Sequence, residues 1–209
     1  MTRAYASTAR QEKADGTRAR VIDTAARMLE RDGLAAMTIA GLAREAGVSP
    51  QTVYNSVGGK AEVVKAAYDV KLAGDHDPTP MSERPAFKAI WEAGDLRSFA
   101  AAYAHWSADI YERVGPLLGV LLFHGAGGDP ILEQFISTIH EERRTGNGHG
   151  IHAVADRGLL AADRDLEQLI DEVWVLTAPE NWHRLVRDRR WSRRRYEEWL
   201  TEHLVVALG

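Results

Sequence analysis

The segment Ile39–Tyr54, Ile-Ala-Gly-Leu-Ala-Arg-Glu-Ala-Gly-Val-Ser-Pro-Gln-Thr-Val-Tyr, constrains the fold of this chain more than any other. It predicts two short helices joined by a tight turn, because Gly47 ends one apolar pattern and Ser49-Pro50 has the residues that begin another helix. Gly47 can take the left-handed conformation that such a turn needs, and Ala43 is small enough for the second helix to cross it. The apolar residues that hold the pair together stand at helix-turn-helix spacing: Leu42, Val48 and Val53.

Helical periodicity continues on both sides of this motif, and no stretch alternates as a strand would, so the chain is predicted to be all-α. One helix is expected from Thr17, a candidate N-cap, to Gly33, and another from about Lys60 to residue 73. The stretch 74–80, Gly-Asp-His-Asp-Pro-Thr-Pro, has the composition of a linker. We therefore predict a flexible basic arm over residues 1–16, a helix-turn-helix domain over residues 17–74 and a second domain over residues 81–209.

Beyond the linker the apolar pattern predicts helices near residues 82–93, 95–113, 115–124, 130–144, 151–158, 165–187 and 192–208. Gly146, Gly148 and Gly150 argue against a continuous helix between the fourth and fifth of these. Pro179 is expected to bend or break its helix, with Thr177 and Glu180 capping the second half.

Charge is unevenly distributed along the chain, whose net charge is −4. Residues 1–74 contain 11 Lys and Arg against 8 Asp and Glu, whereas residues 75–209 contain 15 against 22. The basic excess lies in the first 20 residues, in Arg3, Arg10, Lys13, Arg18 and Arg20. A basic arm suits a polyanionic partner, and a solvated tail explains the same charges equally well.

Several protein classes are disfavoured by what the sequence lacks. It contains no cysteine, which excludes disulfides and thiolate metal sites and fits a cytoplasmic protein. The longest apolar run, residues 114–123, is half of what a membrane helix needs. The histidine spacing favours no metal site, and no catalytic constellation is evident. We therefore expect no membrane segment, metal, cofactor or enzymatic activity.

The polar outer face of the helix-turn-helix is the candidate DNA-binding surface. Its geometry leaves the second helix free to enter a major groove, with Gln51, Thr52, Tyr54 and Asn55 on the outside. Lys60 opens the next helix, where a cation opposes the helix dipole, so its placement indicates an external anion. The predicted DNA-binding residues are Thr38, Ser49, Gln51, Thr52, Tyr54, Asn55 and Lys60.

Residues 17 to about 73 resemble the N-terminal domain of the tetracycline-repressor (TetR) family. The resemblance rests on the leading amphipathic helix, on Thr38-Ile-Ala-x-Leu-Ala-x-Glu-Ala-Gly-Val-Ser, and on Tyr54 and Lys60. It implies that Tyr54 and Lys60 contact the phosphate backbone and that the second helix of the motif reads bases. Two residues depart from the family pattern: Val57 stands where an aromatic residue is usual, and Ser56 where a bulkier one is.

The end of the chain resembles many actinobacterial-type TetR regulators in its run 165–182, in Trp191-Ser192 and in Tyr196-Glu-Glu-Trp-Leu200. Those proteins usually carry glycine where this chain has Arg190. The resemblance implies a homodimer in which the last two helices form a four-helix bundle with their symmetry mates. The predicted interface is Leu169, Val173, Tyr196, Trp199, Leu200 and Leu204, and burial of the same faces within one chain is the alternative.

The middle helices carry the candidate effector site. Aromatic and histidine side chains recur there at inner-face spacing, and the predicted ligand-binding residues are Tyr103, Trp106, Phe123, His124 and Trp174. A filled helical core needs the same residues. The family resemblance implies a helical effector-binding and dimerisation domain, and hence a repressor released from an inverted-repeat operator by a small hydrophobic effector.

Two other functions stay open: a DNA-binding regulator controlled by a protein partner without an effector, and an enzyme with an incidental helix-turn-helix. A last feature is the arginine cluster of residues 184–195. We interpret it as a solvated corner paired with Glu197 and Glu198, with a second nucleic-acid surface as the alternative.

Overall fold

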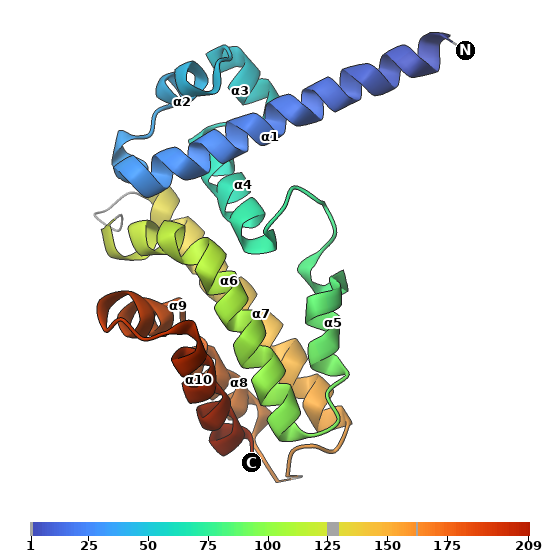
Figure 1. Cartoon of the computed structure of the whole chain (residues 1–209), viewed down its shortest axis with the longest axis vertical. Helices are drawn as coiled ribbons and strands as arrows, with labels where there is room; N and C mark the ends of the chain where they lie inside the picture. Colours follow the sequence, from blue (N-terminus) through green and yellow to red (C-terminus); the bar gives the residue numbers. More distant parts are fainter. Residues whose placement is uncertain (1, 125–129, 162) are drawn as a thin grey trace. The chain divides into compact units, whose positions relative to one another are not determined.

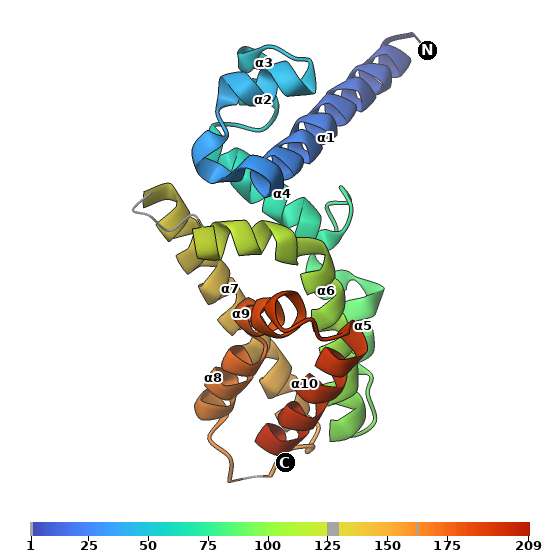
Figure 2. The ribbon, with the colours of Figure 1, turned by 60° about the vertical axis from the view of Figure 1, so that its left-hand side comes forward.

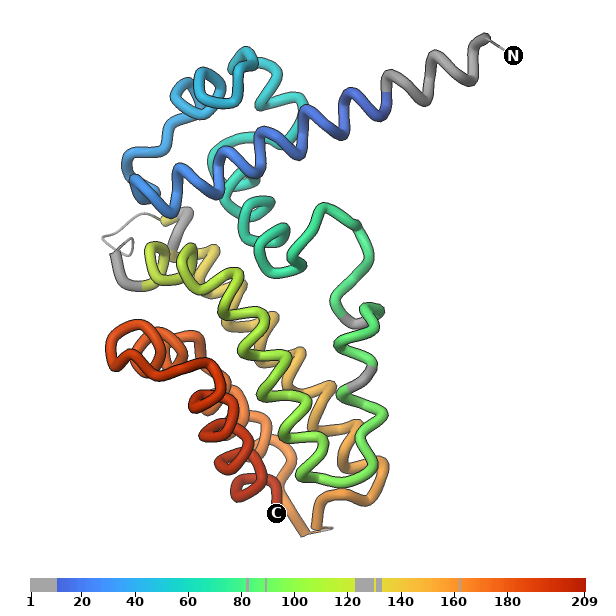
Figure 3. The backbone as a smooth tube through the Cα atoms, viewed as in Figure 1, coloured from blue at the N-terminus to red at the C-terminus, as the bar shows by residue number. Residues whose placement is uncertain are grey.

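The computed structural model describes the backbone of residues 2–124, 130–161 and 163–209, and the side chains in these ranges except those of residues 2–10, 82, 89, 123, 124, 131 and 132 (Figure 3). Within these ranges every regular element is helical, which confirms the all-α prediction (Figure 1). None of the helices described is both long and apolar enough to cross a membrane.

Packing groups the chain into two units. The N-terminal unit comprises Met1–His76 and Pro116–Phe135, and the C-terminal unit comprises Asp77–Gly115 and Ile136–Gly209. From sequence, residues 116–135 are predicted to belong to the second domain, because the linker at residues 74–80 is the clearest composition break. The packing differs because α6 (Leu96–His124) and α7 (Pro130–Asp156) are 29 and 27 residues long. Each spans about 40 Å at 1.5 Å per residue, more than one small core requires.

The first helix, α1 (Thr2–Ala36), begins well before Thr17, which the sequence predicts as its cap. The Thr17 hydroxyl instead donates to the carbonyl oxygen of Lys13 one turn earlier, at 2.9 Å. Alanine, arginine, glutamine and lysine dominate this stretch and favour helix, so residues 2–16 are helical in backbone. Gly33, at φ 78° and ψ 172°, breaks α1 near its predicted end. The predicted inner face is buried: Val21, Ile22, Ala25, Ala26 and Leu29.

Three further helices complete this part of the N-terminal unit: α2 (Ile39–Ala46), α3 (Pro50–Ser56) and α4 (Lys60–Ala73). All three pack against α1. Tyr68 on α4 is buried and packs edge-on against Phe135, with ring centroids 5.4 Å apart. The end of α6 contributes Leu117, Leu118 and Leu121 to the buried apolar residues. Pro116 lies inside α6 and does not divide it into the two helices predicted, because burial of these leucines offsets the lost hydrogen bond and the steric clash that proline causes.

The C-terminal unit is built from the remaining helices. They are α5 (Pro85–Trp91), the first part of α6, most of α7, α8 (Leu166–Leu176), α9 (Pro179–Trp182) and α10 (Arg193–Leu208). A 3-10 turn, Met81–Glu83, precedes α5, and a π-helical turn, His183–Asp188, follows α9. Helices α8 and α10 lie side by side (Figures 1 and 2).

The glycines of α7 do not interrupt it, contrary to the sequence-based expectation. A Cβ atom at Gly150 would lie 3.0 Å from the ring of Trp91 on α5. At Gly148 it would lie 3.5 Å from Ile170 on α8. These two glycines therefore let neighbouring helices approach α7, and the packing gained outweighs the low helix propensity of glycine.

The break at Pro179 is present, although not through the capping predicted. Thr177 ends α8, and its hydroxyl donates to the carbonyl oxygen of Val173 at 2.7 Å. Pro179 then takes the first position of α9, where its missing N–H costs nothing. Asp165 caps the start of α8 by accepting from the amides of Glu167 and Gln168.

Candidate functional site

The turn between α2 and α3 has the geometry that the sequence predicts. Gly47 is left-handed at φ 67° and ψ 37°, and the Val48 amide donates to the carbonyl oxygen of Ala43 at 2.9 Å. Leu42 and Val53 are fully buried, and Ala43 is 1% exposed. These residues fix the angle at which α3 crosses α2, and α2 and α3 form a helix-turn-helix.

Thr38 and Ser49 cap the two helices. The Thr38 hydroxyl accepts from the amide of Gly41 at 3.0 Å, and the Ser49 hydroxyl accepts from the amide of Thr52 at 3.1 Å. The hydroxyls of Ser49 and Thr52 are also 2.8 Å apart. Thr38 and Ser49, predicted as DNA contacts, therefore have a structural role of their own, which leaves their exposed side chains ordered at the helix starts.

The outer face of α3 is exposed and internally ordered. Gln51 donates from Nε2 to the side-chain oxygen of Asn55 at 2.9 Å, one helical turn away. Tyr54 on the same helix is 53% exposed, a large aromatic side chain that the unit leaves outside its core. Gln51, Tyr54 and Asn55 thus share one accessible surface, with Thr52 half-buried at its edge.

Lys60 is the first residue of α4, as predicted, and is half-buried. Within the described part of the chain it forms neither a hydrogen bond nor an ion pair. By contrast, Lys65 on the same helix pairs with Asp69 at 2.9 Å. An unpaired cation at the positive end of a helix dipole is suited to an anion from outside the chain.

Two arginines of α1 have a role that the sequence analysis missed. Arg18 donates to the carbonyl oxygen of Ser56 at 2.5 Å, and Arg20 donates to that of Ala46 at 3.1 Å. These carbonyls end α3 and α2, so the two arginines cap both helices of the motif from outside it. The sequence places Arg18 and Arg20 only in the basic excess of the first 20 residues, because nothing local to either residue identifies the distant carbonyl it meets.

The predicted effector residues fall into separate groups. Tyr103 is buried and lies against Trp106, with ring centroids 5.6 Å apart. Trp174 is half-buried and instead packs on His140, at 5.7 Å, and donates from its indole to the His140 carbonyl at 3.2 Å. Phe123 and His124 lie at the end of α6, and their side chains fall outside those described.

An aromatic cluster surrounds Tyr103 and Trp106 in the C-terminal unit. Ring centroids between 5.1 and 6.1 Å apart link its members, which are Phe87, Trp91, Phe99, Tyr103 and Trp106. Phe87, Trp91 and Trp106 are half-buried. The cluster therefore offers partly accessible apolar surface, which both a ligand site and an incompletely covered core possess.

A buried polar cluster lies next to it and was missed by the sequence analysis. The Tyr103 hydroxyl donates to Asn147 on α7, whose amide donates to the Thr177 hydroxyl at 3.2 Å. The Tyr111 hydroxyl and the Arg143 guanidinium both donate to the Thr177 carbonyl. Burial raises the pKa of Tyr103 and of Tyr111, so both phenols stay neutral. Burial lowers the pKa of Arg143, but Tyr111, Tyr103 and Glu180 together outweigh this effect, so the net pKa is raised and the guanidinium remains charged.

The residues predicted to form the dimer interface differ in how accessible they are. Five of its residues are buried in the chain's own core: Leu169, Val173, Tyr196, Leu200 and Leu204. Trp199 is half-buried between Tyr196 and His203, with ring centroids 5.7 and 4.9 Å away. The most exposed large apolar side chains of α8 and α10 are Val175, 56% exposed, and Val206, 79% exposed.

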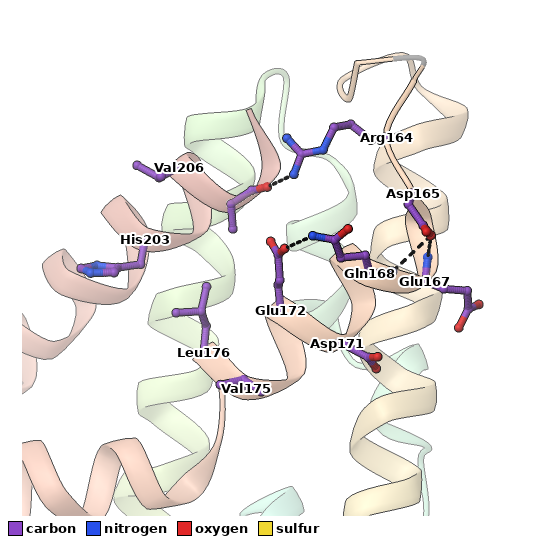
Figure 4. Close-up of a pocket in the computed structure, with 11 residues that line it drawn as sticks. Arg164, Asp165, Glu167, Gln168, Asp171, Glu172, Val175, Leu176, His203 and Val206 are labelled. Atoms are coloured by element: carbon purple, nitrogen blue, oxygen red, sulfur yellow. Dashed lines mark hydrogen bonds between the residues drawn. The ribbon is translucent and has the colours of Figure 1, made fainter.

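An open groove of about 890 Å³ runs between α8 and α10 beside these valines (Figure 4). Its apolar walls come from Val175, Leu176 and Val206, and His203 on α10 also lines it. Its α8 side carries the acids Asp165, Glu167, Asp171 and Glu172. The groove is therefore a surface feature, separate from the aromatic cluster predicted as the effector site.

The arginine cluster is partly neutralised, as expected. Arg194 pairs with Glu198 at 2.7 Å, and Arg193 pairs with Glu197, Asp109 and Glu112. Arg190 lies at φ 59°, in the left-handed region, where the resembling regulators usually carry glycine. The departure from that pattern thus falls on a position whose backbone favours glycine.

Comparison with known proteins supports the resemblance of the helix-turn-helix region to the TetR family. Residues 21–67 match the family model of bacterial regulatory proteins of the tetR family. No curated protein matches the chain.

Solved structures share the fold of nearly the whole chain. A TetR-family transcriptional regulator from Syntrophomonas wolfei has a TM-score of 0.72 at 12% identity, covering 93% of this chain and 96% of its own. FadR from Bacillus subtilis, solved with stearoyl-CoA, has a TM-score of 0.69 at 16% identity, covering 91% and 98%. The SmeT–triclosan complex has a TM-score of 0.69 at 16% identity, covering 92% and 91%. Residues 21–67 thus match the tetR family model, and the chain as a whole shares its fold with TetR-family transcriptional regulators of known structure.

Proposed function

We propose that this TetR-family transcriptional regulator is a homodimeric repressor that binds an inverted-repeat operator and is released by a small hydrophobic effector. The observation that carries the proposal is the exposed polar face of α3 beside the unpaired Lys60. The protein would act in the cytoplasm, where it meets its operator.

The DNA-binding role divides between two sets of residues. Tyr54 and Lys60 offer a hydroxyl and an ammonium group to phosphates, contacts that carry no base sequence. Gln51 and Asn55 offer amide groups able to form paired hydrogen bonds with adenine in a major groove. Because Gln51 and Asn55 already bond to each other, their side chains are ordered before DNA arrives.

Dimerisation is proposed through the exposed side chains of α8 and α10. Val175 and Val206 are the strongly exposed apolar residues of these helices, and the groove beside them offers a second copy of the chain a surface to pack against. A two-fold dimer would present two copies of α3 to operator half-sites roughly 34 Å apart.

Effector release is proposed through the C-terminal unit. Its half-buried aromatic cluster offers apolar surface, and the two neighbouring structures FadR and SmeT were solved with the hydrophobic molecules stearoyl-CoA and triclosan. To release DNA, an effector must bind the low-affinity conformation more tightly, with a coupling of typically ~1–3 kcal/mol.

A matched pair of lysines on α4 tests the DNA-binding role. Lys60→Ala should weaken binding to all DNA sequences alike and reduce the salt dependence of binding, because one phosphate contact is lost. Lys65→Ala removes a lysine that is already paired with Asp69 and should leave affinity nearly unchanged. The measurement is fluorescence anisotropy at several salt concentrations, with operator DNA selected from a random pool. Equal behaviour of the two variants would contradict the proposed role of Lys60.

A further inference from the structure

The C-terminal unit holds a guanidinium with one nitrogen that the described residues leave without a hydrogen-bond partner. Arg143 on α7 donates through Nη2 to the carbonyl oxygens of Trp174, at 3.0 Å, and Thr177, at 2.8 Å. Its other nitrogen, Nη1, is buried and has neither a hydrogen-bond partner nor an ion pair among the described residues. A buried N–H group of a cation without an acceptor is costly, so this nitrogen is a candidate ligand donor.

A second unpartnered donor belongs to the same cluster. The Tyr196 hydroxyl on α10 is fully buried and, within the described part of the chain, has no hydrogen-bond partner. Its ring packs edge-on against Trp182 at 4.9 Å, and Trp182 lies 6.2 Å from Tyr111, which shares the Thr177 carbonyl with Arg143. Burial raises the pKa of Tyr196, and Tyr111 raises it further. The phenol therefore stays protonated, able to donate.

Glu180 is the acid whose charge bears on this arginine. It raises the pKa of Arg143, although less than Tyr111 and Tyr103 do, and its Oε2 is itself buried without a partner in the described residues. The two side chains form no ion pair, although both belong to the described part of the chain. The Arg143 charge thus lacks a direct counter-ion, which a bound anion would supply.

The polar and aromatic clusters meet at Tyr103. Its hydroxyl belongs to the polar cluster through Asn147, and its ring belongs to the aromatic cluster, 5.6 Å from Trp106 and 5.9 Å from Phe99. A ligand that spans Tyr103 would therefore place an apolar body against Trp106 and a polar end toward Arg143.

We propose that the effector is an organic acid with an apolar, preferably aromatic, body, whose carboxylate accepts hydrogen bonds from Arg143 Nη1 and Tyr196 OH. This inference rests on the proposed function for the existence of an effector and adds its chemical class. A carboxylate can accept from both of these buried, unpartnered donors, of which one is charged, and such charge-assisted hydrogen bonds are the stronger kind.

Three probes of one shape test the class of ligand: 2-naphthoate, 2-naphthamide and 2-naphthalenemethanol. Calorimetry on the full chain should show 2-naphthoate binding at least about tenfold more tightly than the two neutral probes, the value of one charge-assisted bond. Equal affinity of all three, or no binding of 2-naphthoate, would overturn the inference. The proposed function is judged separately, since operator binding by the unliganded protein and its loss in Lys60→Ala do not depend on any probe.

Matched variants test the residues. Arg143→Gln should weaken 2-naphthoate binding by about 10- to 100-fold and leave 2-naphthalenemethanol binding unchanged. Arg144→Gln alters the adjacent, exposed arginine, which pairs with Glu167 and Asp171, and should change neither. Because Arg143 also holds the end of α8, Tyr196→Phe serves as a second variant. It removes only an unpartnered hydroxyl, so it should keep or raise Tm while weakening 2-naphthoate binding by a few-fold. Wild-type affinity for 2-naphthoate in both variants would place the carboxylate elsewhere and overturn the assignment.

Discussion

The helix-turn-helix and the C-terminal unit are organised over different distances along the chain. The caps that order α2 and α3 join residues three apart, Thr38 with Gly41 and Ser49 with Thr52. In the polar cluster, Tyr103 bonds to Asn147 across 44 residues, and Tyr111 bonds to Thr177 across 66. The surface proposed to bind DNA is therefore fixed largely by local chemistry, whereas the region proposed to sense an effector exists only once distant helices have packed.

This difference fits the separate roles proposed for the two regions, DNA binding and effector sensing. The caps at Thr38 and Ser49 order the starts of α2 and α3 through residues of the helix-turn-helix itself, which favours a constant DNA surface. A cluster assembled from α6, α7, α8 and α10 responds to small shifts among those helices, which an effector can bias.

The largest expected effect is on dimerisation, through the exposed face of the C-terminal unit. Val206→Glu should leave the monomer folded, because the side chain is 79% exposed, and should weaken dimerisation by about 100-fold, since a two-fold interface receives the buried charge twice. Sedimentation velocity across a concentration series measures the change. Glu198→Ala, on the same helix but outside the groove, is the control. A monomeric wild type at micromolar concentration would exclude the proposed interface.

The next effect is on stability, where alanine substitutions at two glycines of α7 should act in opposite directions. Gly150→Ala should lower stability by about 1–3 kcal/mol, because its Cβ would lie 3.0 Å from the Trp91 ring. Gly146→Ala should raise stability by about 0.5–1 kcal/mol, because nothing lies within 4 Å and alanine is the better helix former. Urea unfolding of the two variants measures both. Stabilisation by Gly150→Ala would show that α5 and α7 are not held close by this contact.

Sequence reasoning succeeded where structure is local and failed where it is not. Gly47, Ser49 and Lys60 stand at the helix ends that the motif predicts, because each of these ends depends on residues only a few positions away. The continuity of α7 was missed, since the reason for Gly150 is Trp91, almost sixty positions earlier. The buried role of Leu200 and Leu204 on α10 was left open for the same reason: a helix face looks alike in sequence whether it meets its own chain or a partner.

A smaller effect is expected from the long-range bonds that α1 makes to the locally capped helices of the motif. Arg18→Met and Arg20→Met each remove a bond from α1 to the last turn of a motif helix, to Ser56 and Ala46. Each should lower stability by about 0.5–1.5 kcal/mol and weaken DNA binding, because α3 and α2 lose a cap. Thermal unfolding and anisotropy should change together. Lys13→Met, on the same helix, controls for the loss of charge. If it weakened DNA binding as strongly, charge alone would explain the effect and capping would not.

The smallest effect concerns a single backbone angle between the π-helical turn and α10. Arg190 lies at φ 59°, a conformation that costs a side-chain-bearing residue about 1–2 kcal/mol and glycine almost nothing. Arg190→Gly should therefore stabilise the protein by about 0.5–1 kcal/mol after the greater flexibility of glycine in the unfolded chain is subtracted. Arg189 is the matched control, because it lies at φ −90° and ψ −1°, where glycine brings no relief. Arg189→Gly should lower stability by about 0.5–1 kcal/mol, so the two neighbouring substitutions should shift Tm in opposite directions. Shifts of the same sign would mean that the left-handed turn at residue 190 does not form in solution, and that the path from α9 into α10 is set by the contacts of Trp182 and Tyr196 alone.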